Sequence, residues 1–103
     1  MLYRIAIIDQ DFTARERTHC LAASFFAQRG ESAAFVICAG TEELPAYYDC
    51  YLRGDAARVS LLRSAEETLP WRSTEKPLET DAFYAMLSAW RELLQSSDGK
   101  EGT

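Results

Sequence analysis

Apolar residues gather along the chain in short runs separated by polar and glycine-containing segments. The runs at residues 3–8 and 33–38 lack polar alternation, which is typical of strands buried in a sheet. Between them, apolar positions recur at three- and four-residue spacing until Gly30 supplies a stop. The pattern therefore predicts a parallel strand–helix–strand unit, with a helix over residues 12–29 and Asp11 as its N-cap.

The middle of the chain allows two interpretations. Thr41 and the two glutamates after it are typical of a helix start, and we favour a helix that ends near Arg53. The alternative is a remnant strand at residues 50–53, followed closely by the strand predicted at 58–62. Because parallel pairing needs a crossover of a dozen or more residues, these two strands would then be antiparallel. The helix keeps an ordinary parallel arrangement, so it is the expected form.

The C-terminal part of the chain is predicted to contain a turn, an edge strand and a long helix. Residues 64–67 favour a short helical turn, and residues 71–75 favour a polar edge strand. Thr80 then caps a final helix that carries two adjoining apolar stripes. We expect one α/β domain over residues 1–95 and a disordered tail over residues 96–103, because the tail has no apolar anchor.

Composition limits the possible partners. With 103 residues and 48% apolar content, the chain can build one modest core. A net charge of −5 argues against nucleic-acid binding, and no apolar run approaches the roughly 20 residues that span a membrane. We expect a cytoplasmic protein with no membrane contact and no small-molecule substrate. Cys20, Cys38 and Cys50 are expected to be free thiols, because their spacing matches no ligand or redox motif.

The order of these segments resembles the receiver domains of LytTR-type response regulators of two-component signalling. The similarity is carried by residues 5–11, 25–31, 41–44 and 59–67 and by the Lys76-Pro77 pair. It implies a small three-layer fold of flavodoxin and receiver type, with a parallel sheet of about four strands. One βα unit would be missing, because the chain between Glu43 and Arg58 is too short for the family's third strand, loop and helix.

By resemblance, the strand ends would hold the remnant of a phosphoacceptor site. Phosphoryl transfer to an aspartate requires a carboxylate nucleophile, a divalent cation and a positioned ammonium. Gln10 replaces the family's second acidic residue, so we expect no cofactor and at most weak Mg²⁺ binding. Arg63 and Lys76 are expected to form permanent ion pairs with the aspartates of the acidic cluster, Asp9 and Asp11. The alternative is that both aspartates are only loop and cap residues.

The resemblance leads to a first functional hypothesis, a non-enzymatic pseudo-receiver that binds a protein partner. That partner would be a second copy, as a homodimer, or another signalling regulator. The last helix would supply the interface, because two apolar stripes exceed what one sheet needs. The interface residues would be Tyr84, Leu87, Trp90 and Leu94. Alternatively, the second stripe fills the gap left by the missing unit.

Two further hypotheses belong to other classes. Asp55 or Asp9 could be the phosphoacceptor of a rearranged site, which would make the domain a switch that responds to phosphorylation. The third hypothesis is an unrelated small α/β protein whose role the sequence does not disclose.

Overall fold

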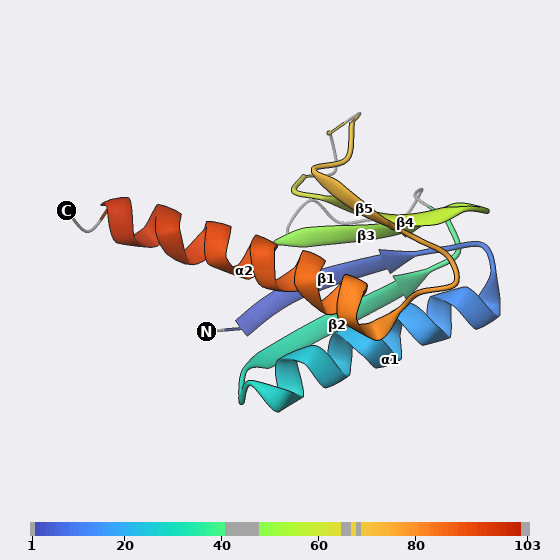
Figure 1. Cartoon of the computed structure of the whole chain (residues 1–103), viewed down its shortest axis with the longest axis horizontal. Helices are drawn as coiled ribbons and strands as arrows, with labels where there is room; N and C mark the ends of the chain where they lie inside the picture. The colour runs from blue at the N-terminus through green and yellow to red at the C-terminus, as the bar shows by residue number, and fades with distance from the viewer. Residues whose placement is uncertain (1, 41–47, 65–66, 68, 102–103) are drawn as a thin grey trace.

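The computed structural model describes residues 2–40, 48–64, 67 and 69–101, with side chains up to residue 95. Within these residues the chain forms two helices and five strands (Figure 1). In chain order they are β1 (Leu2–Ile8), α1 (Phe12–Gln28), β2 (Ser32–Cys38), β3 (Cys50–Gly54), β4 (Arg58–Leu62), β5 (Arg72–Glu75) and α2 (Thr80–Glu101).

The described strands form one open mixed sheet with the order β2-β1-β3-β4-β5. β1 pairs in parallel with β2 and with β3, whereas β4 is antiparallel to both β3 and β5. β5 consequently runs in the same direction as β1, and β4 alone among the described strands is reversed. The chain therefore leaves β1, β2, β3 and β5 at the same end of the sheet, which we call the carboxyl end.

The α/β class is confirmed, but the arrangement differs from the predicted one. Both described helices cover the same face of the sheet, so the described residues form two layers and not three (Figure 1). The predicted parallel sheet of about four strands is also wrong, because five strands are present and β4 is antiparallel to its neighbours. The sheet becomes mixed because β3 and β4 are joined by a hairpin.

The segment at residues 50–53 is a strand, so the helix favoured there is wrong. Cys50, Tyr51 and Leu52 are all buried, since β3 lies in the sheet between β1 and β4. A helix would turn one of three consecutive side chains toward solvent. Residues 41–47, where that helix was predicted to begin, lie outside the described residues.

The main core lies between the two helices and one face of the sheet. Trp90 of α2 packs edge-on against Tyr3 and Phe26, with ring centroids 5.6 and 6.4 Å apart. The buried members of this core are Tyr3, Ile5, Ile7, Ala22, Phe25, Phe26, Cys50, Leu52, Val59, Leu61, Leu78, Phe83, Met86, Leu87 and Trp90. A smaller buried cluster lies on the opposite face of the sheet and contains Ala6, Ile8, Tyr51 and Leu62.

The interface predicted on the last helix is wrong for two of its four residues. Leu87 and Trp90 are only 0% and 1% exposed, because they point into the core. Tyr84 and Leu94 are partly buried and pack against the same core. Met86, which belongs to the second stripe, is also buried, whereas Ala82 of the same stripe is exposed. The explanation of this stripe by a missing unit stays a prediction.

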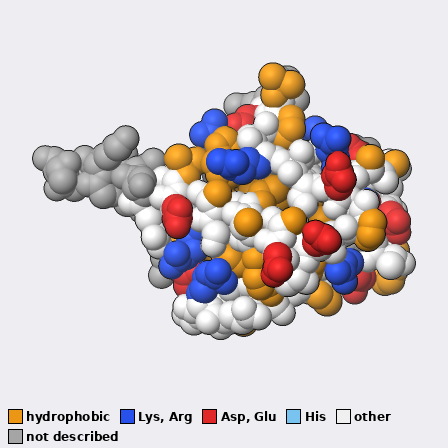
Figure 2. All heavy atoms as spheres, viewed as in Figure 1, with side chains coloured by type: hydrophobic (Ala, Val, Ile, Leu, Met, Phe, Trp, Pro, Cys, Tyr) orange, Lys and Arg blue, Asp and Glu red, His pale blue; other side chains and the backbone are white. Residues whose placement is uncertain are grey.

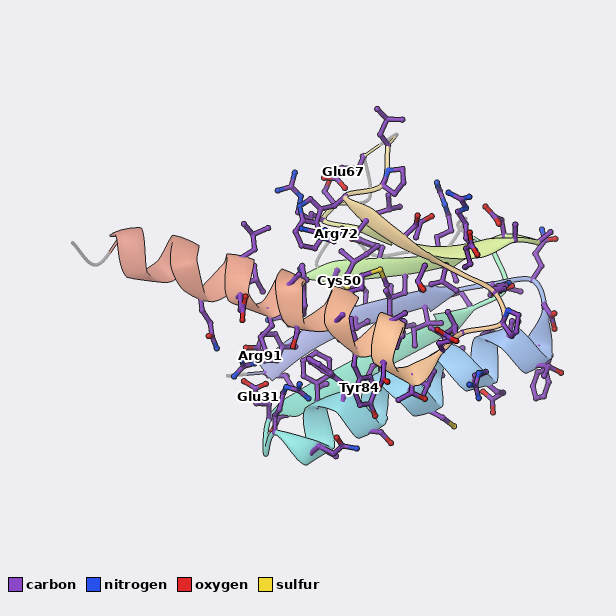
Figure 3. All side chains as sticks on the ribbon, in the orientation of Figure 1. Glu31, Cys50, Glu67, Arg72, Tyr84 and Arg91 are labelled. Atoms are coloured by element: carbon purple, nitrogen blue, oxygen red, sulfur yellow. The ribbon has the colours of Figure 1, made fainter. Side chains whose placement is uncertain are left out.

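α2 is longer than the predicted helix and is attached to the start of β2. It continues past residue 95 to Glu101, while the disorder predicted for residues 96–103 stays a prediction. Arg91 Nε lies 2.6 Å from Glu31 Oε1, and the Tyr3 hydroxyl donates to Glu31 Oε2 at 3.4 Å (Figure 3). In the part of the chain that is described, neither helix is both long and apolar enough to cross a membrane.

Replacing Trp90 with alanine is expected to lower the free energy of unfolding by about 3–5 kcal/mol, because a large buried side chain is lost and a cavity remains. Glu92→Ala, on the exposed side of α2, is the matched control and should change it by less than about 0.5 kcal/mol. Urea unfolding followed by circular dichroism measures both. Equal stability of the two variants would contradict the burial of Trp90.

The pair formed by Arg91 and Glu31 should make stability depend on pH. The hydrogen bond from Arg91 lowers the pKa of Glu31 below its ordinary value of 4.5. A carboxyl whose pKa is lowered by folding stabilises the protein above its unfolded-state pKa, and this contribution is lost as the pH falls through the folded-state value. The stability difference between the wild type and Arg91→Met should therefore be largest near neutral pH and shrink below pH 4.5.

Urea unfolding of both proteins across this pH range measures the difference. A difference that stays constant with pH would show that Arg91 acts through packing of its aliphatic stem alone.

Candidate functional site

A cleft of about 730 Å³ opens at the carboxyl end of the sheet. In open α/β sheets, ligand sites lie outside the carboxyl ends of the strands, so this cleft is the candidate site. It is lined by residues at or after the ends of β1, β2, β3 and β5, namely Ile8, Asp9, Gln10, Asp11, Ala39, Gly40, Arg53, Gly54, Asp55, Ala56 and Lys76.

An ion pair between two largely buried side chains forms part of the cleft lining. Lys76 Nζ lies 2.8 Å from Asp9 Oδ2, and the two side chains are 14% and 4% exposed. Asp9 directly follows β1 and Lys76 directly follows β5, and these strands run in the same direction. The sheet therefore brings together two residues that are 67 positions apart in the sequence. Because the pair is shielded from water, salt screens it much less than a surface ion pair.

Asp9 is held by further bonds on several sides. Its Oδ1 accepts the backbone N–H of Asp11 at 2.9 Å, so both carboxylate oxygens have partners. Its own backbone N–H donates to the carbonyl of Cys38 at 3.0 Å, which links the ends of β1 and β2. Its carbonyl accepts a hydrogen bond from Arg15 Nη1 at 2.9 Å. Asp9 is therefore a fixed part of the sheet end rather than a free side chain.

Gly54 makes room for the carboxylate of Asp9. A Cβ atom at position 54 would overlap Asp9 Oδ2 and would lie 2.6 Å from Asp9 Cγ. Such close contact tolerates only glycine, because every other residue carries a Cβ. The end of β3 thus presents no side chain where it meets Asp9. Nothing in the local sequence around Gly54 indicates this contact.

The other two aspartates of the cleft, Asp55 and Asp11, accept hydrogen bonds from nearby backbone N–H groups. Asp55 Oδ1 accepts the N–H groups of Ala57 and Arg58 at 2.8 and 2.9 Å, in the turn between β3 and β4. These hydrogen bonds lower the pKa of Asp55. The carboxylate of Asp11 accepts backbone N–H groups in the first turn of α1 and caps that helix, as the local pattern predicted.

Arg63 is absent from the cleft, which corrects the predicted cluster. It follows β4, and because β4 is reversed, its end lies at the opposite end of the sheet. There the backbone N–H and Nε of Arg63 bond to the carboxylate of Glu67, at 2.8 and 3.2 Å. Of the two predicted basic residues, the structure therefore brings only Lys76 to the acidic cluster.

Metal-ligating side chains do not converge among the described residues. No group of three or more His, Cys, Asp or Glu side chains in this part of the chain is arranged to hold a metal ion. The three cysteines, which are all described, are free thiols: Cys20 is exposed, Cys38 is partly buried and Cys50 is buried. Burial raises the pKa of the Cys50 thiol, which keeps it protonated and unreactive.

Comparisons with known proteins leave the family of the chain open. No family model matches it, and neither does any curated protein or solved structure. The fold and the cleft define a small α/β protein with an internally paired charge site at the carboxyl end of a mixed sheet. The resemblance to receivers stays a hypothesis.

Gly54→Ala is expected to lower the free energy of unfolding by about 1–3 kcal/mol, because the added methyl group pushes Asp9 away from Lys76. The same change should cost less in an Asp9→Ala background, where the carboxylate is absent. Urea unfolding of the wild type, both single variants and the double variant gives the coupling free energy. Equal costs in both backgrounds would contradict the close contact between Gly54 and Asp9.

Proposed function

We propose that the chain is a non-enzymatic, receiver-like binding module that does not accept a phosphoryl group. The observation that carries this proposal is the ion pair between Lys76 and Asp9, seated against Gly54. Phosphoryl transfer needs an ammonium that is available to the phosphoryl oxygens and a carboxylate free to attack. In this cleft the ammonium and the most buried carboxylate already neutralise each other.

The composition of the cleft also disfavours a divalent cation. Mg²⁺ binds through carboxylate oxygens in nearly octahedral geometry. Asp9 already has partners on both oxygens, and Gln10 offers a neutral amide at the position where the receiver resemblance implies a second acidic ligand. Asp11 uses its carboxylate to cap α1. A cation entering the cleft would therefore have to replace existing hydrogen bonds.

Protein binding is the activity that remains for such a module. A switch requires two arrangements whose balance a ligand changes, and the ion pair stabilises one arrangement without any ligand. The module would therefore bind its partner constitutively, either a second copy or another signalling regulator. Acidic and basic side chains are interspersed over the face seen in Figure 2, which favours a protein partner over a nucleic acid.

A second candidate function is supported by the position of Asp55. This residue follows the central strand β3 and lines the same cleft as Lys76. An aspartate carboxylate is ionised at neutral pH, as an attack on a phosphodonor requires. The two backbone hydrogen bonds to Oδ1 oppose this role, because they hold the carboxylate in the turn.

The third hypothesis, an unrelated α/β protein, also has a specific observation in its favour. β4 is antiparallel to β3 and β5, whereas the receiver resemblance implies a parallel sheet. The proposed module accommodates this difference only if the loss of a βα unit leaves a hairpin in its place. The charged cleft and its strand-end residues are then what the chain shares with receivers.

Magnesium and a small-molecule phosphodonor are expected to leave the protein unchanged. Intact-mass measurement should show no added phosphoryl group, because Lys76 is paired with Asp9 and two backbone N–H groups hold Asp55 in its turn. Backbone amide spectra should show no shifts at Asp9, Asp55 or Lys76. Asp55→Asn is the matched control: a phosphoryl adduct on the wild type that this variant lacks would overturn the proposal and establish Asp55 as a phosphoacceptor.

A further inference from the structure

β2 forms an edge of the sheet that lacks the usual protection against pairing. Its outer side pairs with no strand in the described part of the chain. The strand is seven residues long and has the sequence Ser-Ala-Ala-Phe-Val-Ile-Cys, without a charge or a proline. Edge strands offer free N–H and C=O groups to other strands, and proteins usually protect them by shortness, charge, proline or bulges. β2 is not short, and it carries neither a charge nor a proline.

The opposite edge of the same sheet is protected. β5 has four residues and carries Arg72 and Glu75, which are both exposed. Arg72 is labelled in Figure 3. The guanidinium of Arg72 lies over the ring of Trp71, 4.6 Å from its centroid, which holds a charge beside this edge. Pro70 and Pro77 flank the strand. The contrast shows that the chain leaves only one of its two described sheet edges open to pairing.

The pairing of β2 with β1 determines which residues of β2 direct their N–H and C=O groups away from the sheet. The carbonyl of Cys38 accepts the N–H of Asp9, so Cys38 directs its backbone groups toward β1. Because these groups alternate in direction along a strand, Ala34 and Val36 also bond toward β1. Ala33, Phe35 and Ile37 therefore direct their N–H and C=O groups away from the sheet.

We propose that this edge pairs with β2 of a second copy of the chain, in an antiparallel register centred on Phe35. In this register Phe35 faces Phe35 and Ala33 faces Ile37 of the other copy, so all three outward-directed residues bond. Each such pair exchanges two backbone hydrogen bonds. A two-fold axis perpendicular to the sheet relates the copies, as a closed isologous dimer requires.

The side chains of β2 suit this self-pairing. Ala33 lies opposite Ile37, Ala34 opposite Val36 and Phe35 opposite Phe35, so apolar side chains meet along the seam, as stabilising cross-strand pairs require. Ile37 is 37% exposed in one copy and would lose water contact across the seam. The His19 ring packs edge-on against Phe35 at 4.9 Å, which keeps α1 over this strand and fixes the central side chain.

The sequence of β2 favours a second copy of the chain as the pairing partner. A pairing strand must present its own unprotected edge of matching length and must bring apolar side chains to both faces, and β2 itself meets both conditions. The inference deepens the proposed binding module by naming its partner and surface. It is tested separately from phosphorylation, because neither Lys76 nor Asp9 contributes to this edge.

Sedimentation equilibrium over a range of concentrations tests the dimer. The wild type should pass from monomer to dimer as the concentration rises. Ala33→Pro removes one outward-directed N–H from each copy, and proline is tolerated on edge strands, so the dissociation constant should rise at least about tenfold. Ser73→Pro on the β5 edge is the matched control and should associate like the wild type. Circular dichroism checks that both variants fold.

Amide hydrogen exchange on the unmodified protein provides a second readout that no folding defect can affect. Exchange at Ala33, Phe35 and Ile37 should slow as the concentration rises, while exchange at Ser73 stays unchanged. A wild type that remains monomeric, or a dimer in which these three amides are not protected, would overturn the β2 pairing. Either result leaves the phosphodonor experiment, and with it the proposed function, to be judged on its own outcome.

Discussion

β4 runs against every other described strand, and the position of Lys76 depends on this reversal. The hairpin at the end of β3 turns the chain back, so β5 returns in the direction of β1 and ends beside it. Lys76, directly after β5, therefore meets Asp9, directly after β1. The same reversal sends Arg63 to the opposite end of the sheet, where it binds Glu67. One short turn thus decides that Lys76, and not Arg63, lies in the cleft.

The resulting ion pair restricts which ligands could bind in the cleft. Breaking a buried pair by removing one partner typically costs about 3–5 kcal/mol, because the other charge is left uncompensated. A ligand that competes for Lys76 must therefore also satisfy Asp9. Gly54 adds a geometric condition, since only a residue without Cβ leaves space for this carboxylate at the end of β3. These two constraints keep Asp9 and Lys76 engaged with each other at the carboxyl end of the sheet.

Several local features of the fold could be predicted from the sequence, because each depends on neighbouring residues. Apolar runs without polar alternation mark β1 and β2, and Asp11 caps α1 with backbone partners in the next turn. Residues 50–53 could not be assigned in this way. A short apolar run fits both a strand and a buried helix segment, and the choice depends on pairing with β1 and β4. Likewise, the width of the apolar face on α2 did not reveal that Trp90 packs against Tyr3.

By itself, therefore, the sequence determined an α/β class, the approximate places of α1, α2 and four of the described strands, and a set of charged residues at strand ends. Tertiary structure alone decided that β4 is reversed, that Lys76 and not Arg63 reaches Asp9, and that Gly54 receives its carboxylate. It also decided that Leu87 and Trp90 are core residues. The physical reason is common to all of these outcomes: strand direction and charge pairing depend on residues far apart in the chain, which short-range patterns do not encode.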